Sequence, residues 1–211
     1  MITLSLTSYN RPEYLQQTLN SLAQTDFGYD RLEIFCFDDN SDDFRTVQLL
    51  RRFKHPNLRV NLSFRDKRLG CDANNFTALR YLFNRGEKYV FVIDSDGICK
   101  KNWYKFLTRK IKEYPNLGGL SLFNAMPASY ISKHDDELNE VKSFGGFASL
   151  INGEAFRGLN LEKSWDLDFC EYARNRGYQI LCSNKSYFQH IGEFGEHSSD
   201  KWCIKANNYV D

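Results

Sequence analysis

The sequence predicts an α/β fold in which a mixed, mainly parallel central sheet is flanked by helices. Within the first hundred residues, short apolar runs alternate four times with amphipathic patterns of helical period, which is typical of parallel βαβ units. Polar side chains gather directly after the apolar runs, where ligands bind in such sheets. The 211 residues contain no internal repeat, low-complexity segment or linker, so we expect one domain over residues 1–211.

The first half of the chain supplies the regular part of this pattern. Residues 2–8 alternate apolar and hydroxyl side chains as a first strand, and Pro12 stands where a helix begins. Further strands are predicted at residues 32–37, 58–64 and 89–93. The last of these holds five consecutive apolar residues, which indicates a strand buried on both faces. Gly86 ends the helix before it.

The second half is less regular. Helices are predicted at residues 103–113 and 166–176, and they end at Pro115 and Gly177 respectively. Strands are predicted at residues 118–123, 144–151 and 178–182, with a glycine kink in the second. The polar segment 125–142 is expected to be a mobile excursion from the fold.

Composition excludes several classes of protein. A formal net charge of +1 provides no basic field for nucleic acid, and no apolar run approaches the length of a transmembrane segment. A strand pattern begins at Ile2, so no signal peptide is expected. The six cysteines form no CxxC pair, which favours buried free thiols in a reducing compartment. We therefore expect a soluble, cytoplasmic protein.

Two carboxylates follow the buried run at residues 89–93 directly. Asp94 and Asp96 are one residue apart, and burial of such charges is costly unless a positive group satisfies them. A divalent cation that carries phosphates would do so. The other strand ends supply Thr7, Ser8, Tyr9, Asn10, Arg11, Asp38, Asp39, Arg65, Lys67 and Arg68. This arrangement favours a nucleotide site, although the polar loops of a solvated rim would give a similar pattern by chance.

An ordered set of short segments resembles the GT-A glycosyltransferases of the family-2 type. The segments are Leu6–Pro12, Phe37–Ser41, Gly70 with Ala73–Asn75, Asp94–Asp96, Gly145–Gly146, Trp165–Phe169 and Gln189–Gly192. The resemblance covers nearly the whole chain, although each segment alone is a weak signal. It implies a GT-A (Rossmann-like) fold with a nucleotide-sugar-binding half at residues 1–100 and an acceptor and catalytic half at residues 101–211.

The resemblance assigns donor contacts residue by residue. The positions that match nucleotide-sugar-binding residues of the family are Thr7, Tyr9, Arg11, Asp39, Arg68, Asn74, Asp94 and Ser95. Asp39 matches the carboxylate that accepts a hydrogen bond from uracil, and Tyr9 offers a stacking face. Many members of the family carry an arginine where this chain has Asn74, so phosphate or ribose contacts are expected from Lys67 and Arg68 instead.

The same resemblance implies a metal site that holds Mn²⁺ or Mg²⁺. Asp94 and Asp96 match the metal motif, and His190 matches a late histidine that closes the metal or diphosphate site. Oxygen ligands with one imidazole suit these cations better than zinc. An ordinary core or surface role for His190 remains open, and His197 is a weaker candidate for the same position.

The proposed general base lies in a second Asp-x-Asp pattern. Asp166 matches the family's catalytic carboxylate, while Trp165 replaces the acidic residue that usually precedes it. A plain acid at a helix N-terminus, as Asp168 would be, is the alternative interpretation. Trp165 and Gly146 are expected to line the pocket for the acceptor or the donor sugar, with Trp165 able to stack on a sugar ring.

Together these observations predict a metal-dependent inverting glycosyltransferase. It would move a hexosyl or deoxyhexosyl group from a nucleotide diphosphate sugar, expected to be UDP-linked, to a hydroxyl of a glycan acceptor. A non-catalytic domain that binds nucleotide sugars or glycans is an alternative. A sugar nucleotidyltransferase would need a glycine-rich loop after the first strand, and Thr7–Pro12 contains no glycine. A Rossmann dehydrogenase is disfavoured because no GxGxxG follows any predicted strand.

Overall fold

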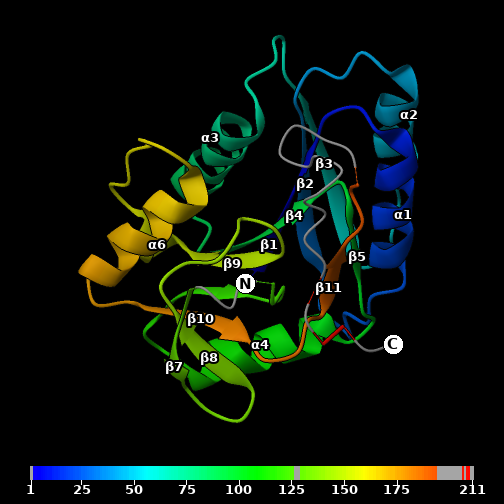
Figure 1. Cartoon of the computed structure of the whole chain (residues 1–211). Helices are drawn as coiled ribbons and strands as arrows, with labels where there is room; N and C mark the ends of the chain where they lie inside the picture. Colours follow the sequence, from blue (N-terminus) through cyan, green and yellow to red (C-terminus); the bar gives the residue numbers. More distant parts are fainter. Residues whose placement is uncertain (1, 126–128, 194–205, 207, 210–211) are drawn as a thin grey trace.

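The computed structural model describes residues 2–125, 129–193, 206, 208 and 209. Within these residues, nine strands form one mixed sheet with helices on both faces (Figure 1). Their spatial order is β3 (Leu58–Phe64), β2 (Leu32–Asp38), β1 (Ile2–Ser8), β4 (Tyr89–Asp94), β9 (Ser149–Asn152), β6 (Leu117–Ser121), β10 (Gln179–Ser183), β8 (Leu138–Val141) and β7 (Tyr130–Lys133). The predicted fold class is thereby confirmed.

The four strands of the first half are parallel, as the sequence pattern predicted. β1 pairs in parallel with β2 on one side and with β4 on the other, and β3 pairs with the outer side of β2. The chain therefore moves outward from β1 to β3 and then returns to the opposite side of β1. This reversal of strand order opens a crevice beyond the carboxyl ends of β1 and β4.

Two hydrophobic layers bury the two faces of the sheet. One contains residues of α1 (Pro12–Ala23), α2 (Phe44–Arg52) and α4 (Trp103–Glu113). The other contains residues of α3 (Cys71–Asn84), α5 (Gly153–Phe156) and α6 (Trp165–Asn175). Figure 1 shows α1 and α2 on the opposite side of the sheet from α3 and α6. Phe91 and Val92 of β4 belong to different layers and both are fully buried, as the apolar run predicted.

The second half corrects two predictions. The segment expected to be a mobile excursion contains the antiparallel hairpin of β7 and β8, which extends the main sheet through β10. The strand expected over residues 144–151 is shorter, because only β9 pairs, antiparallel to both β4 and β6. Ala148 has a φ of 53° just before it. Short strands with distant partners leave little periodic signal in the sequence.

Two other expectations concern membranes and cysteines. Among the helices of the described residues, none has the length and apolar character needed to span a membrane. The five cysteines of the described residues are free thiols, and only Cys71 among them is exposed. The sixth, Cys203, lies outside the described residues.

Candidate active site

A cavity of about 1260 Å³ lies at the carboxyl ends of β1, β2 and β4 and continues to β7 and β8. Its wall brings together most of the site residues that the sequence suggested, but not Asp38, Arg65 or Lys67, so of the two cations expected to contact phosphate or ribose only Arg68 lines the cavity. The suggested residues in the wall include Thr7, Tyr9, Arg11, Asp39, Arg68, Asn74, Asp94, Ser95, Asp96, Gly146, Trp165, Asp166 and His190. His197 lies outside the described residues. Residues far apart in the chain therefore share one site.

The carboxylates of Asp94 and Asp96 have different surroundings. Asp94 accepts a hydrogen bond of 2.9 Å from the Thr7 hydroxyl, and burial together with the charge of Asp96 raises its pKa to about 6. Asp96 is 4% exposed, and its Oδ2 lies 3.0 Å from Arg11 Nη1 and 3.3 Å from His190 Nε2. Burial alone would raise the pKa of Asp96, but these two cations hold it below the ordinary value. Asp96 is therefore the more acidic member of the pair.

His190 reaches Asp96 through a small second sheet. β11 (Phe188–His190) pairs with β5 (Gly97–Cys99), so His190 lies opposite Gly97 and close to the end of β4. Burial lowers the pKa of His190, but the hydrogen bond to Asp96 outweighs it, and the pKa is raised overall. A Cβ on Gly192 would lie 2.4 Å from Asp96 Oδ2, so this glycine permits the close approach. The imidazole ring of His190 therefore lies in the cavity wall.

Asp96 and His190 offer two suitable ligands for Mn²⁺ or Mg²⁺. An oxygen and an imidazole nitrogen already converge there, and Asp94, the last residue of β4, precedes Asp96 by two residues. Within the described residues, no group of three or more histidine, cysteine or acidic side chains is arranged to hold a metal ion. A cation would therefore take its remaining ligands from phosphate oxygens and water, as Mg²⁺ commonly does.

Asp39 and Tyr9, which the sequence assigned to the nucleotide base, form another part of the cavity wall. Both carboxylate oxygens of Asp39 accept backbone hydrogen bonds of 2.8 Å, from Leu69 and Gly70, which fixes the carboxylate at the end of β2. Asp39 is 3% exposed. The guanidinium of Arg68 lies 4.2 Å from the centroid of the Tyr9 ring. A planar base could take the place of that guanidinium on the ring.

A network of short polar side chains shapes the loops after β1 and β2, and sequence reasoning missed it. The backbone of Asn10, Arg11 and Asn40 adopts positive φ angles of 51°, 54° and 64°. Asp38 is 1% exposed and accepts hydrogen bonds from the hydroxyls of Ser8 and Ser41. Asparagine and aspartate tolerate such turns, so the Asp-Asp-Asn-Ser run was the available signal.

Asn74 lines the cavity but uses its amide within the protein. Its Nδ2 donates to the Phe37 carbonyl at 3.2 Å, and its Oδ1 accepts from Arg65 Nε at 3.0 Å. The side chain is 2% exposed. These bonds join α3 to the end of β2 and to the loop after β3. A donor contact through Asn74 stays a prediction.

Asp166 and Asp168 stand on the first turn of α6 but face different parts of the molecule. Oδ2 of Asp166 accepts from the Gly146 amide at 2.7 Å, and Oδ1 accepts from the Leu167 amide and the Ser164 hydroxyl. Asp168 accepts from the amides of Glu162 and Lys163 and does not line the cavity. The structure thus separates a carboxylate available to a ligand from one that stabilises a loop.

Trp165 lines the cavity, but it is too buried to act as the stacking surface for a sugar that the sequence suggested. The side chain is 3% exposed, and a Cβ on Gly146 would lie 2.2 Å from its Cζ2. The ring also belongs to the hydrophobic layer that contains α3 and α6. Little of its face is open for stacking on a sugar ring. Gly146 and Trp165 therefore determine the shape of the cavity beside Asp166.

Comparison with known proteins agrees with this architecture. The model of glycosyl transferase family 2 matches residues 4–156. The structure of S. aureus TarS residues 1–349 in complex with UDP-GlcNAc has a TM-score of 0.72 at 20% identity, covering 93% of this chain and 60% of that one. Another S. aureus TarS structure has a TM-score of 0.70 at 20% identity and covers 89% and 36%.

A third similar structure is a mannosyltransferase in complex with a different nucleotide sugar. The mannosyltransferase PcManGT from Pyrobaculum calidifontis, in complex with GDP-Man and Mn²⁺, has a TM-score of 0.63 at 20% identity and covers 85% of this chain and 53% of that one. This chain spans less than two thirds of the length of these proteins. No curated protein matches the sequence. At these identities the structures establish the GT-A fold.

Proposed function

Because the chain belongs to glycosyl transferase family 2, we propose that it transfers a hexosyl or deoxyhexosyl group from a nucleotide diphosphate sugar to a carbohydrate hydroxyl, with inversion at the anomeric carbon. The observation that carries the proposal is the single cavity shared by Asp96, His190 and Asp166. The family match ends at residue 156, so the roles of His190 and Asp166 rest on their positions in this cavity.

The donor would lie with its base at Asp39 and Tyr9 and its diphosphate at Arg11 and Asp96. UDP is the proposed nucleotide, supported by the UDP-GlcNAc complex of TarS and by the carboxylate of Asp39 as partner for the uracil ring. Asp96 and His190 would bind Mn²⁺ or Mg²⁺ directly and Asp94 would contact a water on the cation or the ribose, and the bound cation would supply Lewis-acid stabilisation of the leaving diphosphate. The Mn²⁺ complex of PcManGT supports this choice of cation.

Asp166 would act as the general base. Hydrogen bonds from Gly146, Ser164 and Leu167 orient its carboxylate at the cavity wall. As the acceptor oxygen bonds to the anomeric carbon, the bond from that carbon to the diphosphate breaks and its electron pair leaves with the nucleotide. The acceptor proton passes to Asp166. The base and the leaving group then lie on opposite sides of the sugar, which gives inversion.

A binding and turnover experiment tests the proposal. UDP with Mn²⁺ should raise the melting temperature of the wild-type protein, because a ligand that binds only the folded state stabilises it. Removal of Mn²⁺ by a chelator, or the substitution Asp96→Asn, should remove most of that shift. A nucleotide shift that is absent from the wild-type protein would contradict the donor site, and retention of anomeric configuration by NMR would contradict inversion.

Two further points belong to the proposal. A non-catalytic binding domain would bind UDP but show neither transfer nor Mn²⁺-dependent hydrolysis of the donor, so turnover separates it from an enzyme.

We also propose a cytoplasmic location, which the five free thiols of the described residues support.

A further inference from the structure

The cavity continues well beyond the donor site, as far as the hairpin of β7 and β8. In the order of the main sheet, β8 is four strands away from β4 and β7 is five strands away. Adjacent strands are about 4.8 Å apart, so the hairpin lies roughly 19 to 24 Å along the sheet from β4. A single sugar attached to a diphosphate at Asp96 does not reach that far. This end of the cavity is available to a second molecule.

The chemistry of this second end differs from that of the donor site. Its described lining residues are uncharged and carry amides, hydroxyls or apolar groups, namely Asn124, Ser129, Tyr130, Asn139, Val141 and Ser143. Amides and hydroxyls both donate and accept hydrogen bonds, as sugar hydroxyls do. A bound phosphate or carboxylate would find no cationic partner among these six residues. The lining therefore suits a neutral polar ligand.

The strand register places three of these residues on the same face of the hairpin. Tyr130 pairs with Val141 across the hairpin, and Asn139 precedes Val141 by two residues, so the three share one face. All three line the cavity, whereas Ile131, the neighbour of Tyr130, does not. Tyr130 is 47% exposed. An exposed aromatic ring beside an amide is a suitable platform for the apolar face of a sugar.

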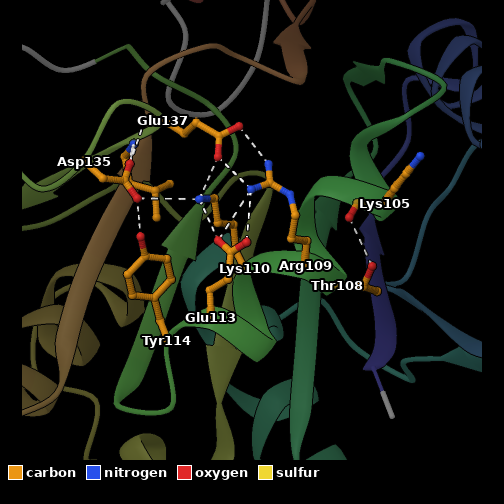
Figure 2. Close-up of polar contacts among 9 residues, drawn as sticks. Lys105, Thr108, Arg109, Lys110, Glu113, Tyr114, Asp135 and Glu137 are labelled. Carbon is orange, nitrogen blue, oxygen red and sulfur yellow. Dashed lines mark hydrogen bonds and ion pairs between the residues drawn. The ribbon is translucent and has the colours of Figure 1, made fainter.

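The turn of the hairpin is fixed to α4 by a cluster of charges, which Figure 2 shows. Lys110 is 2% exposed, and its Nζ lies 2.8 Å from Glu137 and 2.9 Å from Glu113. Arg109 also bonds Glu137 at 2.7 Å, and the Tyr114 hydroxyl donates to Asp135. A hairpin held in place loses little conformational freedom when a ligand binds.

We propose that the β7–β8 hairpin is the acceptor subsite and that it takes an uncharged saccharide. The Tyr130 ring stacks on a pyranose of the acceptor, and Asn139 hydrogen-bonds its hydroxyl groups. The inference rests on the proposed function, because the bound saccharide presents its hydroxyl to Asp166. It goes further in assigning the acceptor to a neutral chemical class and to two named side chains.

Immobilised saccharides test the inference directly. The probes are neutral di- and trisaccharides of glucose, galactose, mannose and rhamnose, with a matched set that carries glucuronate or sugar phosphate. Wild-type protein should bind members of the neutral set only. Tyr130→Ala should weaken binding about 5- to 10-fold, since aromatic contacts contribute on the order of 1 kcal/mol beyond area burial. Tyr130→Phe should retain most of the affinity, and Asn139→Ala should also weaken binding.

Ile131→Ala is the matched control, because Ile131 is 40% exposed on the same strand but faces away from the cavity. It should leave saccharide binding unchanged, and the UDP–Mn²⁺ melting shift should be the same in all variants. Binding of the anionic set alone, no binding of any saccharide by protein that binds UDP, or an equal loss in Ile131→Ala would overturn the inference. Absence of the UDP shift from the wild-type protein would instead overturn the proposed function.

Discussion

The two halves of the chain differ in their strand pairing and in what they present to the cavity. β1 to β4 have six or seven residues each and are parallel, whereas β6 to β10 have four or five and include antiparallel pairs. The first half places charged groups such as Arg11, Asp39 and Asp96 at the cavity. The hairpin of the second half places uncharged ones there.

This difference gives the cavity two parts of different chemistry. Parallel βα units bring their strand ends to one edge, so a nucleotide site can be built from loops close to a regular scaffold. The antiparallel strands extend the same sheet sideways and add a wall of different chemistry. Asp166 lies between the two regions. Its carboxylate accepts a hydrogen bond from the Gly146 amide of the second half, and the backbone N–H of its neighbour Trp165 donates to Asp72 of α3 in the first half.

The largest expected effect is on turnover at this junction. Asp166→Asn should lower kcat by about 10²- to 10⁴-fold, the usual contribution of a general base, with the UDP–Mn²⁺ melting shift preserved. The matched control is Asp168→Asn on the same helix turn, where kcat should change little because that carboxylate bonds the Glu162 and Lys163 amides. Steady-state kinetics of both variants decide the matter, and equal losses would assign Asp166 a structural role.

The next effect concerns the glycine pair that supports the base. Gly146→Ala would bring a methyl group within 2.2 Å of Trp165 Cζ2, so the ring and the adjacent Asp166 must shift. We expect a loss of about 1 to 3 kcal/mol in the free energy of unfolding, with reduced kcat. At Gly145 nothing lies within 4 Å of the added methyl group, so Gly145→Ala should cost much less. Urea denaturation compares the two, and similar losses would refute the steric argument.

A smaller effect is expected within the second half alone. Lys110→Met keeps the buried aliphatic stem but removes the ammonium that joins Glu113 and Glu137. We expect a loss of about 1 to 2 kcal/mol in the free energy of unfolding, less than for a fully buried ion pair, because the remaining carboxylates are 40% and 45% exposed. Lys112→Met, at an exposed position of the same helix, should change stability little in the same urea experiment.

The smallest effect is a dependence of stability on acid pH. Hydrogen bonds from Arg109 and Lys110 lower the pKa of Glu137 to about 2, below its value of about 4.3 in an unfolded chain. A lowered folded pKa contributes stability above pH 4 that is lost as the pH falls toward 2. Since Glu137 is 45% exposed, the contribution should be under about 1 kcal/mol.

Urea midpoints at pH 5.5 and pH 3 measure this contribution. The difference between the wild-type protein and Glu137→Gln should shrink at the lower pH. Asp136→Asn is the control, because its side chain is 95% exposed and should show a smaller change. A difference that stays constant between the two pH values would contradict the linkage.

The sequence by itself determined the parallel half and most of the residues that line the cavity at its strand ends. Continuous apolar runs and helical periodicity depend on neighbouring residues, so β1, β2 and β4 could be read directly, as could the polar groups that follow them. Asp94 and Asp96 were expected at a ligand site because they stand at the carboxyl end of the apolar run of β4. Thr7, Asp39 and Asp96 then meet because parallel strands end at one edge.

Only the tertiary structure decided the rest, because it depends on contacts between distant segments. The hairpin of β7 and β8 is stabilised by β10 and by the Lys110 cluster, neither of which leaves a local pattern. The Gly146 amide and the Glu162 loop decide that Asp166, and not Asp168, faces the cavity. Two acids on the first turn of one helix thus differ in their surroundings through partners that the local sequence does not contain.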